Sequence, residues 1–250
     1  MLNILLCGCG GRMGAAVAAA AEAAGDRIVA GVDVSPVAAG SYPVFHSPEE
    51  FEGHADVMID FSHHSALGAL LTYATRTGTP LVVCTTGHTE EELAEMRAAA
   101  EKAPIFFSRN MSLGINLLIA LCRRAAATLG EDFDIEIIEK HHNQKLDAPS
   151  GTALMIADAI CEEGGEHPYV YDRHAVRRKR ERGEIGLHAV RGGNIVGEHE
   201  VMFCGQNEIL TLSHSAASRE VFATGALRAA RFMQGKGAGL YNMDDVVNAL

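Results

Sequence analysis

The sequence predicts an α/β protein built from a Rossmann-type parallel sheet domain and a second, α+β domain with a mostly antiparallel or mixed sheet. Three observations predict this class. Up to about residue 110, short apolar runs alternate with Ala-rich amphipathic segments, a glycine-rich loop follows the first run, and the pattern changes beyond residue 112. At 250 residues the chain is long enough for two modest cores.

The first part of the chain has the pattern of successive βα units. Its strands are predicted from short aliphatic runs bounded by Gly, Pro or Asp, at 2–7, 27–32, 56–60, 80–84 and 104–107. Segments rich in Ala, Leu, Glu and Arg predict helices at 13–24, 65–77 and 90–102. Thr89 is the expected N-cap of the last of these helices, because acidic residues follow it.

The second part of the chain reads differently. A helix at about 113–129 leads to an alternating strand at 134–140, then to a loop with Pro149 and Gly151. Three further strand-like runs are separated by Gly-Gly-Asn and Gly-Gln-Asn, which predicts antiparallel hairpins at 185–191, 195–203 and 207–214. A helix is expected at 219–233.

Composition limits the function classes. The net charge of -11 argues against general nucleic-acid binding, which needs a basic surface. One basic run, at 173–182, is most simply a solvated loop; attraction of an anionic substrate ranks second, and nucleic acid a distant third.

The chain is expected to be a cytoplasmic protein. No run approaches the roughly 18 apolar residues of a membrane span, and the first residues lack the basic start and cleavage site of a signal peptide. The six cysteines, at 7, 9, 84, 122, 161 and 204, are scattered as free thiols in a reducing compartment would be. Cys7 and Cys9 are close together but lack two further well-spaced ligands, so strand and turn packing is preferred over a metal site.

The glycine-rich loop, Gly8-Cys9-Gly10-Gly11-Arg12-Met13-Gly14, opens the first predicted helix. Such a loop lets a pyrophosphate approach the backbone N–H groups of a helix N-terminus. Asp33 ends the second strand, where a carboxylate accepts hydrogen bonds from the adenosine ribose. Val34, Ser35 and Pro36 follow without a cation for a 2'-phosphate, so NADH is the expected preference, while Arg12 keeps NADPH possible.

The segment 136–153, EIIEKHHNQKLDAPSGTA, places titratable groups where a strand ends. A histidine can deliver a proton near neutral pH, and a lysine can neutralise a carboxylate or a developing anion. Strand alternation gives His141 and His142 different directions, one for chemistry and one for substrate binding, and spacing does not say which is which. Ser150 is the expected N-cap of a helix whose N-terminus can hold a carboxylate.

Two other interpretations of this segment are weaker. Surface histidines followed by an ordinary helix cap would be the default for any one feature alone, but the crowding of these groups argues against it. A metal site formed by His141, His142 and Asp147 is poorer, since neighbouring histidines rarely converge on one ion, and no metal is expected.

These motifs resemble the 4-hydroxy-tetrahydrodipicolinate reductase family, also called dihydrodipicolinate reductase, of lysine and diaminopimelate biosynthesis. The resemblance covers nearly the whole chain and depends on GCGGRMG near the start, CTTGH at 84–88, NMSLGIN at 110–116, the 136–153 segment and RGGNIVGEHEV at 191–201. The string HHxxKxDAPSGTA is highly specific. The resemblance implies hydride transfer from NAD(P)H to a ring carbon of a cyclic imine dicarboxylate.

The resemblance also implies residue roles. His141 would donate the proton with Lys145 as a catalytic cation, and the substrate's carboxylates would be held by His142, Lys145, Gly151 and Thr152. The dinucleotide would contact Gly8, Cys9, Gly10, Gly11, Arg12, Met13, Asp33, Cys84, Thr85, Thr86, Ser108, Arg109, Asn110 and Met111. This chain departs from the family at Cys84, commonly glycine, and at Arg109, commonly a small residue.

The family is usually homotetrameric, with a C-terminal helix that returns to the cofactor domain. The expected organisation is therefore a dinucleotide-binding domain at 1–111 and 220–250 and a substrate-binding and oligomerisation domain at 112–219. Two alternative functions are a nicotinamide-sensing redox module, for which the basic run is the only support, and a Rossmann reductase of another small acid, against which the segment at 141–152 argues.

Overall fold

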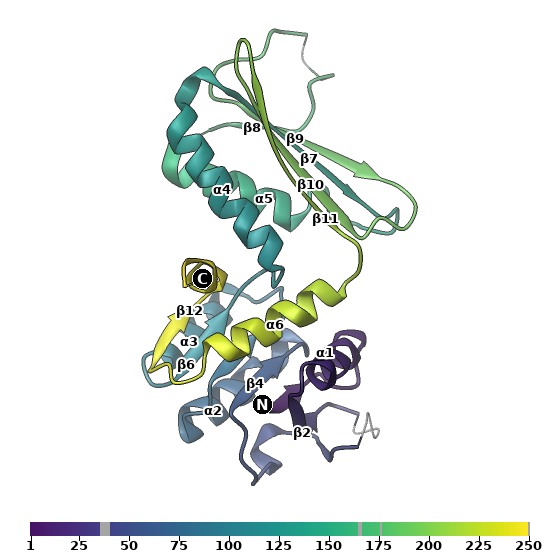
Figure 1. The fold of residues 1–250 in the computed structure, drawn as a ribbon, viewed down its shortest axis with the longest axis vertical. Coiled ribbons are helices and arrows are strands. Elements are labelled where there is room, and N and C mark those ends of the chain that lie inside the picture. Colours follow the sequence, from purple (N-terminus) through teal and green to yellow (C-terminus); the bar gives the residue numbers. More distant parts are fainter. Residues whose placement is uncertain (36–40, 165–166, 176, 250) are drawn as a thin grey trace. The chain divides into compact units, whose positions relative to one another are not determined.

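The computed structural model describes residues 1–35, 41–164, 167–175 and 177–249. Its internal contacts divide the chain into two compact units, one formed by Met1–Leu113 with Arg219–Leu250 and the other by Gly114–Ser218. The first unit is therefore made of two stretches of chain, one before and one after the second unit in the sequence (Figure 1).

The first unit contains a seven-stranded sheet in which every pair of neighbouring strands is parallel. The strand order is β12-β6-β5-β4-β1-β2-β3. This order places β1 at the point where the winding of the sheet reverses, as in a Rossmann domain. The strands are β1 Asn3–Cys7, β2 Arg27–Val32, β3 Val44–Phe45, β4 Val57–Asp60, β5 Leu81–Val83, β6 Pro104–Phe107 and β12 Gly239–Tyr241.

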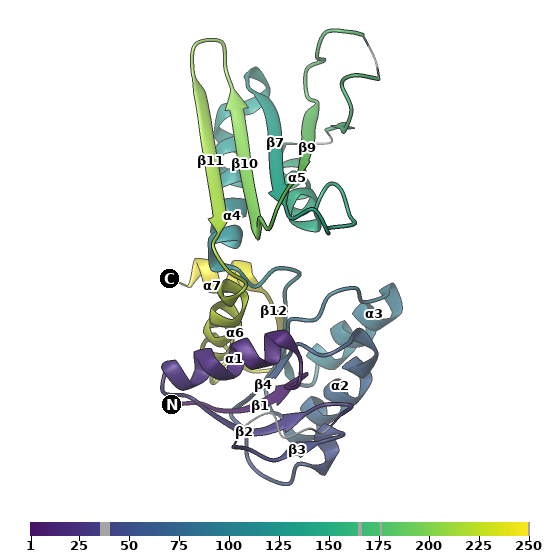
Figure 2. The ribbon, with the colours of Figure 1, turned by 90° about the vertical axis from the view of Figure 1, so that its right-hand side faces the viewer.

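Helices cover both faces of this sheet (Figure 2). Successive residues of β1 point to opposite faces, so Ile4 and Leu6 pack with α1 and α6 while Leu5 and Cys7 pack with α2 and α3. The helices are α1 Arg12–Ala23, α2 Leu67–Thr77, α3 Glu90–Ala100, α6 Glu220–Phe232 and the short α7 Met243–Asn248. As predicted, Thr89 caps α3, and Glu92 completes a capping box.

Several short elements were not predicted. They are β3, β8 (Tyr169–Val170), β12 and α7, and single 3₁₀ turns at Pro48–Glu50, His64–Ala66 and Gly130–Asp132. Elements of two to six residues are too short to show a hydrophobic period, so sequence pattern alone could not identify them.

The second unit contains a five-stranded mixed sheet in the order β11-β10-β7-β9-β8. Its strands are β7 Asp134–His141, β8 Tyr169–Val170, β9 Ile185–Arg191, β10 Gly197–Cys204 and β11 Ile209–Ala216. Two helices, α4 Leu113–Leu129 and α5 Gly151–Gly164, form one core with the sheet. That core holds Ile135 and Ile137 of β7, while Glu136 and Ile138 point to the other face.

The predicted hairpins are only partly correct. Strands β10 and β11 form an antiparallel hairpin, but β9 does not pair with β10, because β7 lies between them and pairs parallel with β9 and antiparallel with β10. A Gly-Gly-Asn turn predicts that the chain reverses, and it does not identify the partner of the returning strand.

The basic run at 173–182 is exposed along most of its described length, but three of its arginines are ion-paired. Arg173 and Arg178 both bind the buried Glu184, at 2.9 and 2.8 Å, and Arg180 binds Asp134 of β7 at 2.7 Å. Glu136 of β7 also accepts hydrogen bonds from Arg173 and Arg180. These three arginines are therefore neutralised by acids on or beside β7 and β9, which a count of local charge could not reveal.

The segment Leu113–Asp132, which is α4 and the turn after it, is long and apolar enough to cross a membrane by length and composition. Its apolar side, with Leu118, Ile119 and Cys122, is buried in the core of the second unit. The segment also carries Arg123 and Arg124. We therefore interpret α4 as a core helix.

Candidate active site

The glycine loop connects β1 to α1 by a close turn. Gly8 has φ +75°, in the region that favours glycine, and its carbonyl oxygen accepts from Gly11 N at 3.1 Å. A Cβ on Gly14 would lie 2.3 Å from that same oxygen, so the close approach requires glycine. The first turn of α1 lies within the described residues and has neither a side-chain cap nor an acidic residue. Its N–H groups are therefore suited to an anion.

Asp33 lies beside this loop, directly after β2. Its Oδ2 accepts from Gly10 N at 3.0 Å and its Oδ1 from Ser35 N at 3.1 Å. A Cβ on Gly10 would lie 3.1 Å from Oδ2, so a side chain there would require the carboxylate to shift by a few tenths of an ångström. Each carboxylate oxygen retains acceptor capacity for a ribose hydroxyl. Arg12, the first residue of α1, is exposed. Pro36 lies outside the described residues.

The other predicted cofactor segments follow β5 and β6. The loop with Cys84, Thr85 and Thr86 begins one residue after β5, and the segment 108–111 begins one residue after β6. Since these strands are parallel, both segments lie at the sheet edge that also carries Gly8 and Asp33, which is the ligand-binding edge of such folds. Cys84 is buried, and burial raises the pKa of its thiol, so this departure from the family is a core residue.

A polar cluster at the same edge was missed by sequence reasoning. Asp60, the last residue of β4, is buried, which raises the pKa of its carboxyl, and it accepts from Ser62 N at 2.9 Å. Glu92 of α3 binds His64 Nδ1 at 2.8 Å and lies 3.4 Å from His88 Nδ1. These contacts join the loops after β4 and β5 to α3. The available signal was the position of Asp60 at the end of a predicted strand, with Ser62 and His64 in the loop that follows it.

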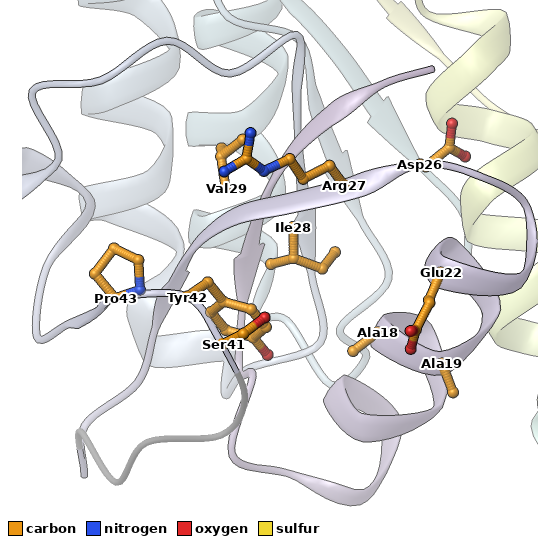
Figure 3. Close-up of a pocket in the computed structure, with 10 residues that line it drawn as sticks. All are labelled: Ala18, Ala19, Glu22, Asp26, Arg27, Ile28, Val29, Ser41, Tyr42 and Pro43. Atoms are coloured by element: carbon orange, nitrogen blue, oxygen red, sulfur yellow. The ribbon is translucent and has the colours of Figure 1, made fainter.

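One pocket of the first unit lies elsewhere. It has a volume of about 460 Å³ and is lined by residues of α1, of the first half of β2 and of the segment before β3 (Figure 3). None of the predicted site residues lines it. Because Arg27 and Ile28 begin β2, this pocket belongs to the end of that strand away from Asp33.

In the second unit, β7 brings Glu139 and His141 to the same face, since they are two residues apart on a strand. His141 Nδ1 lies 2.6 Å from Glu139 Oε2. Because a carboxylate only accepts, Nδ1 is the donor, and Nε2 is the nitrogen left for chemistry. Among the described residues Nε2 has no hydrogen-bond partner, and a Cβ on Gly197 would lie 3.1 Å from it.

Glu139 is fully buried yet ionised. Burial alone would raise its pKa, but hydrogen bonds from Arg191, His141 and Ser150 N hold that pKa below its ordinary value. Arg191 donates to both carboxylate oxygens, at 2.7 and 2.8 Å, and Ser150 N donates at 3.0 Å.

Lys145 lies in the loop between β7 and α5. Its Nζ is 2.9 Å from Asp147 Oδ1, and this hydrogen bond, aided by the backbone N–H of Gly151, lowers the pKa of the Asp147 carboxyl. The Asp147 side chain is 56% exposed, so the pair stabilises the fold little. Lys145 and the N-terminus of α5, two of the features predicted to hold a substrate carboxylate, thus already bind one carboxylate of the chain.

Helix α5 begins as predicted. Ser150 is buried and its Oγ accepts from Ala153 N at 3.2 Å, which is the geometry of an N-cap. Gly151 and Thr152 form the first turn, and Gly151 is exposed. His199 Nε2 lies 3.1 Å from Ser150 Oγ, and burial, followed by the charge of His141, lowers the pKa of His199 to about 4. His199 is therefore neutral near pH 7.

Sequence reasoning found His141, Lys145 and the cap but missed Glu139, Arg191 and His199. The available signal for Glu139 was its position two residues before His141 in an alternating strand. Arg191 and His199 are 50 and 58 residues from His141 in the chain, and only the pairing of β7 with β9 and β10 brings them close.

Comparison with known proteins gives the family. The model of the N-terminal part of dihydrodipicolinate reductase matches residues 2–111, and the model of its C-terminal part matches residues 114–247. The chain belongs to the dihydrodipicolinate reductase family. The resemblance predicted from its motifs is confirmed.

Curated relatives named 4-hydroxy-tetrahydrodipicolinate reductase match this chain over nearly their whole length. The chain is 52% identical to 4-hydroxy-tetrahydrodipicolinate reductase of Caldanaerobacter subterraneus subsp. tengcongensis, covering 99% of this chain and 98% of the relative. It is 47% identical to that of Clostridium tetani, covering 100% and 98%. The predicted activity is thereby confirmed: this dihydrodipicolinate reductase is an oxidoreductase of lysine and diaminopimelate biosynthesis.

Solved structures support the fold. A dipicolinate-bound dihydrodipicolinate reductase from Paenisporosarcina sp. TG-14 matches with a TM-score of 0.82 at 26% identity, covering 97% of each chain. An amine dehydrogenase from Mycobacterium smegmatis matches with a TM-score of 0.66 at 13% identity, covering 97% of this chain and 95% of that one, which shows the fold alone. The predicted combination of a parallel sheet domain and a second, mixed-sheet domain is confirmed.

Proposed function

We propose that this dihydrodipicolinate reductase uses NAD(P)H to reduce 4-hydroxy-tetrahydrodipicolinate to tetrahydrodipicolinate, with His141 as the proton donor. One observation carries the assignment of the acid: Glu139 engages Nδ1 of His141, which leaves Nε2 without a partner among the described residues. A histidine held in this way can present a proton in a fixed direction. A bound nicotinamide supplies the hydride.

We infer that the substrate's carboxylates are held by His142, Lys145, Gly151 and Thr152. The contact of Asp147 with Lys145 supports this, because Lys145 and the backbone N–H of Gly151 already donate hydrogen bonds to a carboxylate of the chain. A substrate carboxylate would replace Asp147 at little energetic cost, since the existing ion pair is exposed. The relative from Paenisporosarcina was solved with dipicolinate, a ring dicarboxylate.

For the cofactor we propose contacts from the glycine loop, Asp33 and the segments at 84–86 and 108–111. The open N-terminus of α1 suits a pyrophosphate, and Asp33 suits the ribose hydroxyls. NADH should be preferred modestly, because Asp33 would repel a 2'-phosphate, and the exposed Arg12 should keep NADPH usable.

We further propose a cytoplasmic homotetramer. The face of the five-stranded sheet opposite α4 and α5 carries apolar side chains, among them Val190 and Ile209, which are 44% and 59% exposed in the single chain. Such a face is suited to contact with further copies. Sedimentation velocity of the purified protein would give the assembly state.

The deciding experiment follows nicotinamide absorbance with enzymatically generated substrate and each cofactor in turn. His141→Gln should lower turnover by about 100-fold or more, the usual scale for a positioned general acid. Cofactor affinity, measured by fluorescence titration, should not change. Wild-type turnover in a folded His141→Gln variant would remove His141 from the mechanism.

The redox-sensor alternative loses its only support, because three arginines of the basic run are paired with acids of the second unit. The assay would still identify a sensor, since a sensor would bind NADH without turning over the cyclic imine.

A further inference from the structure

We infer that the buried Glu139–Arg191 pair is the positioning unit of this enzyme, holding the proton donor, the substrate-binding helix start and the lysine loop in one arrangement. The inference builds on the proposed role of His141. Neither Glu139 nor Arg191 needs to touch the substrate for it to hold.

The first step is the position of Glu139. Its side chain has no exposed surface, and its two oxygens receive four hydrogen bonds from three residues: two from Arg191, one from His141 and one from Ser150 N. A carboxylate with this many donors is fixed in place. A buried charge of this kind is tolerated only because Arg191 neutralises it.

The second step is what the pair connects. Oε2 of Glu139 holds His141, and Oε1 holds the backbone of Ser150, the N-cap of α5. Arg191 extends the connection, because its Nη2 donates to the backbone oxygen of Asp147 at 2.6 Å, in the loop that carries Lys145. The three groups that we assign to protonation and carboxylate binding are thus attached to a single ion pair.

The third step is the chemistry. During protonation, the Nε2–H bond of His141 breaks as the substrate carbon takes the proton, and the electron pair of that bond stays on Nε2. Glu139 keeps the Nδ1 proton on His141, so the neutral ring left behind is the tautomer that must regain its proton at Nε2. Glu139 itself stays ionised throughout.

Charges around His141 come from four elements. Glu139 lies on its own strand, Arg191 on β9, His199 on β10 at a ring-centroid distance of 5.3 Å, and Lys145 in the loop before α5. Glu139 is the one carboxylate in hydrogen-bond contact with the ring among the described residues. Removing its charge should therefore disfavour protonated His141, and the positive charge of Arg191 that remains acts in the same direction.

The test compares Glu139→Gln with Glu136→Gln. Glu136 is a suitable control, because it is also an ion-paired carboxylate of β7 but lies on the opposite face. Glu139→Gln should lower kcat about 10- to 100-fold, as removal of an orienting partner usually does. It should also move the alkaline limb of the kcat–pH profile about 1 pH unit lower. Glu136→Gln should change neither.

A double variant separates positioning from a merely structural role. Once His141 is Gln, the further change Glu139→Gln should reduce kcat by less than about 3-fold, because residues that act as a unit are not additive. If the double variant instead lost kcat by the product of the two single losses, or if Glu139→Gln left the pH profile unchanged, the inference would be overturned. Full activity of His141→Gln alone would instead overturn the proposed function.

Two further measurements cover misfolding and substrate binding. If Glu139→Gln does not fold because Arg191 is left as an uncompensated charge, Glu139→Gln with Arg191→Met removes both charges and should show the same loss of kcat. Its pH shift should be smaller, because a positive charge near His141 is removed together with the negative one. Dipicolinate is the probe for binding, and its affinity should fall in Glu139→Gln because the start of α5 is released. Unchanged dipicolinate affinity would remove α5 from the inference.

Discussion

Gly197 lies on β10 where a side chain would meet the proposed proton donor. A Cβ there would stand 3.1 Å from His141 Nε2, closer than most real contacts, and the ring is fixed on its other side by Glu139. Gly197→Ala should therefore displace the imidazole by a few tenths of an ångström and lower kcat roughly 10-fold, with little change in stability.

The matched control is Gly192→Ala. Gly192 lies in the turn after β9, and a Cβ there would meet nothing within 4 Å. Steady-state kinetics should show wild-type kcat for Gly192→Ala. Equal activity of the two variants would mean that the space beside Nε2 is not used in the reaction.

Asp33 is the residue that we expect to set cofactor choice. Asp33→Asn removes the repulsion of a 2'-phosphate while its amide can still receive Gly10 N–H at its oxygen, so the loop should keep its shape. We expect the ratio of kcat/KM for NADPH to that for NADH to rise about 10-fold. An unchanged ratio, measured with both cofactors on both proteins, would show that Asp33 does not contact the ribose.

At the scale of the element, two helical glycines provide a contrast in packing. A Cβ on Gly225 of α6 would lie 1.7 Å from the carbonyl oxygen of Met111, whereas a Cβ on Gly68 of α2 would meet nothing within 4 Å. Gly225→Ala should push α6 off its neighbour and cost about 1–3 kcal/mol of unfolding free energy. Gly68→Ala should be neutral or stabilise by up to about 1 kcal/mol.

Urea denaturation with circular dichroism would compare the two variants. If Gly225→Ala were as stable as wild type, the close contact between α6 and the segment before α4 would not exist in solution. The contrast between the helices matters because both substitutions increase helix propensity equally, so only packing can separate them.

The elements also show what sequence could predict. The longer parallel strands, β1, β2, β4, β5 and β6, were predictable because they form short apolar runs packed between two layers of helices, and α1 because a glycine loop precedes it. Strand partners in the second unit were not, since the central place of β7 depends on contacts between distant segments. The same limit concealed the site: His141 was evident locally, while Arg191 and His199 reach it only through that pairing.

At the scale of the whole molecule, buried His199 predicts how stability responds to acid. Its folded pKa of about 4 lies below the ordinary 6.5, so between these two pH values the unfolded chain is protonated at His199 and the folded chain is not. The contribution of neutral His199 to the unfolding free energy is fully present above about pH 6.5. It falls by about 2–3 kcal/mol as the pH is lowered to about 4.

His199→Gln should accordingly flatten the dependence of unfolding free energy on pH within that window, even if its stability at pH 7 is lower. Urea midpoints at several pH values between 4 and 7 would measure the slope for both proteins. Parallel slopes would show that His199 is protonated in the folded protein.

The division of the first unit into two stretches has a consequence for biosynthesis. Its edge strand β12 and its helix α6, which packs beside α1, are translated only after all of Gly114–Ser218. On the ribosome, the second unit can therefore complete its own core while the first still exposes the apolar surface, with Ile4, Leu6 and Val57, that α6 will cover. The parallel sheet of the first unit is completed only when the last residues of the chain have been translated. Until then, its uncovered apolar surface is what a chaperone would recognise.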